Sequence, residues 1–437
     1  MADRLLTGWG RTAPSRADVV ATAEPENVAS WIRAAGPRGV LARGLGRSYG
    51  DAAQNSGGTV IDLRNTVEIG PVDAVGAVRC SAGTSLEELL CRVLPAGWFA
   101  PVTPGTRQVT LGGALAADVH GKNHHRDGSL AGHVTSVRLV DGLGHVRELT
   151  PKDELFWALP GGMGLCGIVT DLTLRLRPVT SAWMTVRTER TADLDQTISA
   201  LSAADAHTYS VGWIDSLSAS GRGIVTSGEH TPADEVDRAD PLRFAPRALA
   251  VAPAWAPPHL LNKASIAAFN AAYYAAAPRR PKVTQQHSMA FFHPLDVVRG
   301  WNRLYGTAGF LQYQFVVSDV EVVRWALAEL RKGSAPSFLT VLKRFGPGNR
   351  APLSFPAAGW TLAVDLPSEV PGLAGLLDIL DERVCAAGGR VYLAKDARLR
   401  PQLLPSMYPE LPRWQELRDR LDPNRVFSSD LSRRLML

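Results

Sequence analysis

The 437-residue sequence contains no stretch of about 18 uncharged apolar residues, the shortest run that crosses a membrane as a helix. No apolar signal core follows the first residues, Met1 to Arg4, so we see no secretion signal. These two absences exclude a transmembrane helix. They predict a protein that is soluble or, at most, peripherally attached to a membrane.

Cysteine is scarce as well. The four cysteines show no C-x-x-C spacing and stand at Cys80, Cys91, Cys166 and Cys385. Three of them have apolar neighbours, where reduced core cysteines are expected.

A basic stripe is also missing. The net charge is +5, but lysine and arginine are scattered and form only short pairs such as Arg279-Arg280 and Arg433-Arg434. This distribution argues against a nucleic-acid partner. It favours small anionic phosphate groups or an anionic membrane face.

Glycine, by contrast, is clustered. An apolar run ends at Ala42 and is followed by Gly44, Gly46 and Gly50 with small or polar residues between them. Glycine permits positive φ and close approach of the backbone, and successive N–H groups in such a turn hold phosphate oxygens. The stretch is neither a Walker loop nor G-x-G-x-x-G entering a helix. Taken alone, it predicts a phosphate-binding loop only weakly, and a tight turn that binds nothing is the alternative.

Further glycine clusters follow at residues 104–106, 111–114 and 161–170. In this order they resemble the FAD domain of vanillyl-alcohol-oxidase-type flavoenzymes. Five spaced motifs narrow the resemblance to the decaprenylphosphoryl-β-D-ribose 2′-oxidase family, and they lie at residues 43–51, 104–110, 120–125, 310–315 and 394–396. The similarity begins near Leu6 and runs almost to the last residue.

The resemblance implies an α+β, two-domain FAD-binding fold with an inserted antiparallel-sheet substrate domain. We expect residues 1–178 to form the first part of the FAD domain, residues 179–389 the substrate domain, and residues 390–437 a return to the FAD domain. The chain length also favours two domains, and short mixed strands and helices favour α+β.

Local patterns place several elements. Residues 25–33 have helical spacing, and Ser85 or Thr84 with Glu88 predicts a capped helix start. Further expected helices cover residues 153–158, 322–332, 373–387 and 414–421. Alternation predicts a hairpin around residues 141–144 and strands at residues 39–42, 59–63, 168–178, 308–317 and 360–366. Residues 232–258, rich in proline, alanine and arginine, predict an irregular, mobile segment or lid.

Three imidazoles lie close together at His120, His124 and His125, which raises a metal site as an alternative. Ligands at i and i+4 would need a helix, and Gly121 with Asn123 argues against one. We therefore favour a loop that faces the cofactor, with no metal.

The resemblance also implies the cofactor contacts. Many relatives attach the flavin to a histidine in the first glycine loop, where this chain has Arg47-Ser48, so we expect non-covalent FAD. The expected FAD contacts are Arg43, Gly44, Leu45, Gly46, Arg47, Ser48, Tyr49, Gly105, Thr106, Gly112, Gly113, Ala117, Gly121, Asn123, Gly128, His133, Gly167, Ile168, Tyr392 and Lys395.

On a strand, Gln312 and Gln314 point to one face and Tyr313 to the other. Two amides on one face suit sugar hydroxyls, but a solvent-exposed polar face fits the pattern equally well. The resemblance favours the former. It implies substrate contacts at Tyr49, Lys122, Trp213, Tyr305, Gln312, Gln314, Lys343 and Ala363.

Lys395 and His120 are the expected catalytic residues. An ammonium group beside a flavin can stabilise the negative charge that develops on reduction. A surface lysine after a strand is the alternative, although the apolar residues 391–394 favour burial.

The resemblance implies FAD-dependent oxidation of the 2′-hydroxyl of a polyprenylphosphoryl-β-D-ribose. This would be the first half of an epimerisation to the arabinose precursor of cell-wall polysaccharides, completed by a short-chain reductase. The protein would work at the cytoplasmic or periplasmic face of the cell envelope. Oxidation of a soluble sugar or sugar alcohol, and non-catalytic binding of a sugar phosphate, remain the alternatives.

One position departs from the family. Many members carry a cysteine two residues before the aspartate of the strand Gly359 to Asp365, and nitroaromatic inhibitors modify it. Here that position is Ala363, with Thr361 two residues earlier.

Overall fold

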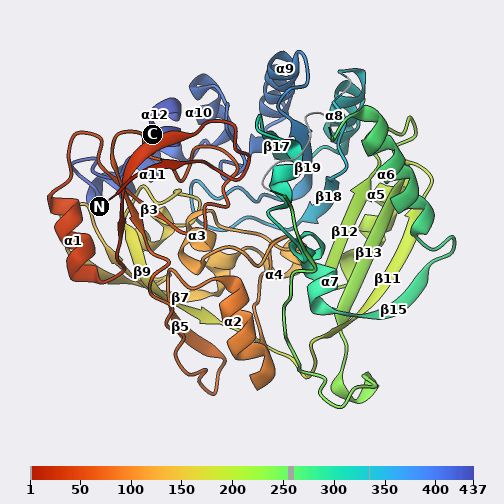
Figure 1. The fold of residues 1–437 in the computed structure, drawn as a ribbon, viewed down its shortest axis with the longest axis horizontal. Coiled ribbons are helices and arrows are strands. Elements are labelled where there is room, and N and C mark those ends of the chain that lie inside the picture. Colours follow the sequence, from red (N-terminus) through yellow and green to blue (C-terminus); the bar gives the residue numbers. More distant parts are fainter. Residues whose placement is uncertain (1, 254–259, 334) are drawn as a thin grey trace.

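The computed structural model describes residues 2–253, 260–333 and 335–437. The N-terminal part of the chain builds two four-stranded sheets, and residues 183–391 build one eight-stranded sheet (Figure 1). This mixture of helices and sheets, with one large antiparallel sheet, confirms the predicted α+β class.

The first sheet leads into the glycine-rich loop. Its order is β1 (Ala2–Leu6), β2 (Ser15–Ala21), β4 (Thr59–Asp62) and β3 (Val40–Arg43). The pairs β2–β4 and β3–β4 are parallel, and β1 joins the edge antiparallel to β2. Helix α1 (Pro25–Arg33), which has its predicted bounds, buries Val28 and Ile32.

The second sheet is antiparallel, and its order is β5 (Ala77–Ser81), β9 (Ile168–Arg175), β7 (Val134–Val140) and β8 (Val146–Leu149). Strands β7 and β8 form the predicted hairpin. Helix α2 (Leu86–Val93) begins with the predicted capping box, in which Ser85 is the cap. The N–H of Glu88 donates to Ser85 Oγ at 3.1 Å, and the N–H of Ser85 donates to Glu88 Oε2 at 2.7 Å.

Short elements surround this sheet. They are β6 (Trp98–Phe99) paired with β10 (Arg177–Pro178), α3 (Leu111–Ala116), the one-turn helix α4 (His124–Asp127), and a 3₁₀ turn over Glu154–Ala158 where a short helix was expected.

The third sheet is antiparallel throughout, in the order β15 (Lys282–His287), β11 (Trp183–Thr191), β13 (Gly223–His230), β12 (Tyr209–Ile214), β18 (Thr340–Phe345), β19 (Gly359–Pro367), β17 (Phe310–Val317) and β20 (Arg390–Val391). Helices α8 (Val320–Lys332) and α9 (Leu373–Ala386) lie beside β17 and β19, while α5 (Leu194–Ala203) and α6 (Lys263–Ala276) lie near β12 and β13 (Figure 1). Helix α7 (Ser288–Phe292) follows β15.

The segment expected to be irregular holds little regular structure. It contains a 3₁₀ turn (Ala233–Glu235) and β14 (Ala250–Val251), which pairs in parallel with β16 (Val298–Arg299). Residues 254–258 of that prediction lie outside the described residues.

The C-terminal residues return to the first sheet through α10 (Leu404–Met407), α11 (Leu411–Leu421) and α12 (Asp430–Leu435). The N–H of Val40 donates to Val426 O at 2.9 Å, and the N–H of Ser428 donates to Val40 O at 3.1 Å. From α12, Arg434 forms a two-pronged ion pair with Asp51 at 2.8 and 2.9 Å. It also contacts Asp396 at 2.9 Å.

Arg434 thus joins three distant segments of the chain. We expect Arg434→Gln to lower the free energy of unfolding of the holoprotein by about 3 kcal/mol, since it leaves two mostly buried carboxylates without their cation. Denaturant unfolding measures this. The control is Arg16→Gln, whose pair with Asp3 is exposed on both sides and should cost less than about 1 kcal/mol. Equal losses in the two variants would contradict the prediction.

Candidate active site

A cavity of about 880 Å³ lies between the loops of the two N-terminal sheets and one face of the eight-stranded sheet. Strands β12, β13, β17, β18 and β19 all contribute to its wall. Its volume is at the upper end of the range of small-molecule sites, about 300–1,000 Å³. The cavity can therefore hold a large cofactor together with part of a substrate.

One end of the cavity is the glycine-rich loop after β3. In the described chain, none of the five backbone N–H groups of residues 44–48 donates a hydrogen bond. Gly46 has φ +62°, and a Cβ on Gly44 would lie 2.1 Å from Thr110 Oγ1. These residues are half-buried and line the cavity, so this row of free donors fits an anionic group such as the flavin diphosphate.

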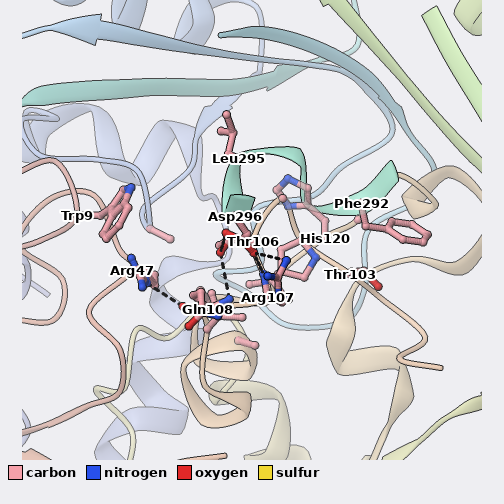
Figure 2. A pocket seen from close by; sticks show the side chains of 18 of the residues that line it. Trp9, Arg47, Thr103, Thr106, Arg107, Gln108, His120, Phe292, Leu295 and Asp296 are labelled. Atoms are coloured by element: carbon pink, nitrogen blue, oxygen red, sulfur yellow. Dashed lines mark hydrogen bonds and ion pairs between the residues drawn. The ribbon is translucent and has the colours of Figure 1, made fainter. Parts of the chain in front are cut away.

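Arg47 supplies a cation beside these donors. Its guanidinium lies 3.9 Å from the centroid of the Trp9 ring, and its Nε donates to Gln108 O at 2.9 Å. Burial lowers the pKa of Arg47, and Asp296 opposes that shift. An arginine still keeps its proton under such conditions. Figure 2 shows Trp9 and Arg47 on the same side of the pocket.

A second loop, residues 104–108, is tied to the turn at residues 294–297. Thr106 Oγ1 donates to Asp296 Oδ1 at 2.7 Å, and the N–H of Arg107 donates to Asp296 Oδ2 at 2.8 Å (Figure 2). Burial raises the pKa of Asp296, and these two hydrogen bonds oppose the rise. Asp296 therefore fixes the position of a loop that lines the cavity.

Lys395 lines the cavity beside Tyr49. Its Nζ is 3.8 Å from the centroid of the Tyr49 ring, and it forms no ion pair with a described carboxylate. Gln312 Nε2 donates to Tyr49 Oη at 3.3 Å and to Asp365 Oδ1. Burial lowers the pKa of the Lys395 ammonium and raises that of the Asp365 carboxyl, while their mutual attraction opposes both shifts.

His120 is buried beside Gln314. The Gln314 amide donates to His120 Nε2 at 3.1 Å and to Thr361 Oγ1 at 3.2 Å. In this arrangement Nε2 accepts, the ring proton is on Nδ1, and Nδ1 has no partner in the described chain. Burial and nearby lysines hold the pKa of His120 well below its usual range, so the imidazole is neutral.

Two more buried lysines line the cavity. Lys122 Nζ donates to Phe291 O and lies 4.0 Å from the Phe291 ring centroid. Burial, with a contribution from Lys343, lowers the pKa of Lys122 to about 7, and burial lowers that of Lys343 to about 8. Neither lysine forms an ion pair with a described carboxylate, so both are available to an anionic ligand.

The structure brings most of the predicted site residues to this cavity. Five of them do not line it: Asn123, Gly128, His133, Ile168 and Tyr305. Asn123 donates to Pro101 O, His133 contacts Asp127 O, and Tyr305 stacks on Phe310 at 4.1 Å between ring centroids. Their contacts with a ligand remain predictions.

Sequence reasoning missed several contributors. The sequence assigned no function to Trp9, and Asp365 served only to locate Ala363 on its strand. Nothing in the sequence pointed to Asp296, because its partners are 189 and 190 residues away. In the described chain, no group of three His, Cys, Asp or Glu side chains is placed to hold a metal.

The buried lysines predict proton uptake on ligand binding. An anion between Lys122 and Lys343 raises pKa values that burial has lowered. At pH 8 the flavin-loaded protein should therefore take up about one proton when it binds a ribose phosphodiester. Affinity should fall as the pH rises from 6 to 9, since both lysines then lose their charge.

Calorimetry in buffers of different ionisation enthalpy measures this uptake. Lys343→Met should remove part of it, whereas Lys152→Met, at an exposed position outside the cavity, should leave it unchanged. A binding enthalpy that does not depend on the buffer would contradict the prediction.

Two family matches agree with this geometry. Residues 17–150 match the FAD binding domain, and residues 378–435 match D-arabinono-1,4-lactone oxidase. The first match contains the glycine loop and the 104–108 loop, and the second contains Lys395. The fold is thus the predicted vanillyl-alcohol-oxidase type, and the chain is an FAD-dependent oxidoreductase.

Whole-chain comparisons are more specific. Decaprenylphosphoryl-β-D-ribose oxidase of Mycolicibacterium smegmatis is 44% identical over 99% of this chain and 97% of its own length. An uncharacterized protein of the mprA 5′ region of Streptomyces coelicolor is 40% identical over 81% of this chain and all of its own. Cytokinin dehydrogenase 2 of Arabidopsis thaliana is 26% identical over 46% of this chain and 41% of its own. With 44% identity along almost its full length, the chain belongs to the decaprenylphosphoryl-β-D-ribose oxidase family.

Proposed function

We propose that this protein oxidises the 2′-hydroxyl of a polyprenylphosphoryl-β-D-ribose to the 2′-keto sugar. The observation that carries the proposal is the group of three desolvated lysines, Lys122, Lys343 and Lys395, none paired with a described carboxylate, on the cavity wall that also presents Gln312 and Gln314. Such a wall suits a ligand that joins a polar sugar to an anionic phosphate.

FAD, when bound, supplies the acceptor for the hydride that leaves C2′. The free N–H groups of residues 44–48 and the Arg47 guanidinium would hold its diphosphate. The amides of Gln312 and Gln314 would orient the sugar hydroxyls. Lys395 would stabilise negative charge that develops in the reaction, in a site where burial strengthens the interaction.

His120 offers a neutral nitrogen close to the sugar. Its Nε2 accepts a hydrogen bond from Gln314. A sugar hydroxyl that replaced the Gln314 amide at this atom would pass its proton to Nε2 as the hydride leaves. The low pKa of His120 means that this proton would be released again readily.

A soluble sugar is the second candidate substrate. Ala363 favours it, because this residue faces the cavity where many relatives have cysteine, so the pocket is not identical to theirs. For the lipid-linked substrate, the 2′-keto product requires a reductase to complete the epimerisation, and we propose a short-chain reductase as partner. We keep residues 179–389 as the proposed substrate domain. Seven of the eight strands of the large sheet lie within these residues, which supports the division, and the edge strand β20 (Arg390–Val391) follows directly after them.

The test is anaerobic turnover, followed as bleaching of the flavin absorbance. A polyprenylphosphoryl ribose should bleach the flavin, whereas free pentoses should not. Bleaching by free pentoses at equal rates would support the soluble-sugar function instead. Acid precipitation of the same preparation should release all of the flavin as FAD, because Arg47 and Ser48 stand where relatives have the attaching histidine.

Lys395→Ala should lower kcat by about 10²–10³-fold, the cost of removing one stabilising donor from a buried site. Stopped-flow flavin reduction measures the loss. Lys152→Ala is the matched control and should be unaffected, since Lys152 is exposed and does not line the cavity. A Lys395→Ala enzyme with near-normal flavin reduction would show that Lys395 has only a structural function.

Ala363 predicts resistance to covalent nitroaromatic inhibitors of this family. Cys166 also lines the cavity, but burial raises the pKa of its thiol to about 12, so it is a poor nucleophile. After incubation with inhibitor and substrate, intact-mass analysis should find no adduct. Ala363→Cys should create a one-to-one adduct, and an adduct on the unchanged protein would contradict the prediction.

A further inference from the structure

Residues 241–300 have an unusual charge distribution. They contain seven lysines and arginines and a single carboxylate, Asp296, which is buried. All seven cations are exposed, and none forms an ion pair with a described carboxylate: Arg243, Arg247, Lys263, Arg279, Arg280, Lys282 and Arg299. The outer surface of this segment is therefore uniformly positive.

Helix α6, in the middle of this segment, is apolar on nearly all sides. Only three of its 14 residues are polar, and only Ile266 and Asn270 are buried. Asn270 Nδ2 donates to Asp215 Oδ1 at 2.8 Å and to Ser337 O at 3.2 Å, which fixes one side of the helix to the sheet region. A helix that is apolar all round normally lies in a protein core or a membrane. Most other residues of α6 are exposed in the part of the chain that the structure describes.

Exposed apolar side chains gather in the same segment. Of the 14 large hydrophobic residues that are exposed in the described chain, seven fall within residues 249–297: Leu249, Val251, Leu260, Phe269, Tyr273, Val283 and Val297. Leu249 is 85% exposed and Val251 is 64% exposed. Two of these residues are neighbours in space, because the N–H of Leu249 donates a hydrogen bond to Val297 O at 2.8 Å. In Figure 1, α6 and β15 lie at the right-hand rim of the molecule.

This surface adjoins the active-site cavity. Pro246, Ala248 and Tyr273 line the cavity, as does the run Ala276 to Pro278. Leu249, Phe269 and Arg279 are their close sequence neighbours on the outside. An apolar chain that leaves the sugar site past these residues would emerge at the exposed apolar face.

We propose that the surface formed by residues 243–251, α6 and residues 279–283 docks on an anionic lipid bilayer. Its apolar side chains would enter the interface and its arginines and lysines would contact lipid phosphates. The polyprenyl substrate would then pass from the bilayer into the cavity without crossing water. This inference rests on the proposed lipid-linked substrate.

Charge decides between a bilayer and a second copy of this chain. Two copies of this face would bring its six exposed cations against six others, which is unfavourable. Anionic headgroups supply the opposite charge and attract each basic residue that lies near the bilayer surface. Exposed apolar residues flanked by lysine and arginine are typical of interfacial membrane binding.

The test is sedimentation of the holoprotein with vesicles. The holoprotein should bind vesicles made of two parts phosphatidylcholine and one part phosphatidylglycerol, and it should bind vesicles of pure phosphatidylcholine far less. The bound protein should dissociate from the anionic vesicles as the salt concentration increases. The double variants Arg279→Ser with Arg280→Ser, and Leu249→Ser with Val251→Ser, should each lower the partition coefficient about tenfold or more. Leu143→Ser with Val146→Ser, and Arg92→Ser with Lys152→Ser, are matched exposed controls and should bind normally.

Activity assays on two forms of the substrate test this inference separately from the proposed function. The two test variants should oxidise a detergent-dispersed, short-chain substrate at the normal rate but slow on a long-chain substrate in vesicles. Absence of vesicle binding by the unaltered holoprotein at low salt would overturn the inference. So would a concentration-dependent dimer that the Leu249 variant abolishes, since a second copy would then cover the face. Vesicle binding without oxidation of any polyprenylphosphoryl ribose would overturn the proposed function alone.

Discussion

The site depends on a close backbone contact between segments that are far apart in the chain. A Cβ on Gly50 would lie 2.1 Å from Asp396 O, and a Cβ on Gly8 would lie 2.0 Å from Gly50 O. The N–H of Tyr49 donates to Ala394 O at 3.0 Å in the same place. Only glycine permits this approach. Because the backbones meet here, the residues on either side, Tyr49 and Lys395, stack over each other inside the cavity.

A second constraint is electrostatic. Taking an ammonium group out of water is expensive unless an anion or a set of hydrogen bonds replaces the hydration shell. Lys122, Lys343 and Lys395 are all removed from water with little compensation from described side chains. The protein alone is therefore less stable at this wall than the protein with an anionic ligand. The same imbalance would favour a ligand that carries negative charge, as the proposed sugar phosphate does.

The sequence was most informative where chemistry is local. The capping box of Ser85 and Glu88 and the alternation of Gln312 and Gln314 depend on neighbours within a few residues, and each was predicted from spacing. The glycine-rich loop could be predicted because its conformation requires glycine, and clustered glycines are visible in the sequence. Contacts such as Thr106 with Asp296, or Asp51 with Arg434, join residues 190 and 383 apart. The periodicity of a sequence carries no information about contacts between such distant residues, so only the structure shows these contacts.

The packing of Gly8, Gly50 and the chain at Asp396 has an evolutionary consequence. A side chain at either glycine would collide with backbone, which cannot move aside as a flexible side chain can. Selection must therefore remove almost every substitution at these two positions, whatever sugar the enzyme uses. Ala363, by contrast, faces the cavity from β19, so a different side chain there would meet the ligand rather than the backbone of a neighbouring segment. Lineages can thus diverge in substrate and in inhibitor sensitivity along β19 while the flavin-binding loop stays constant.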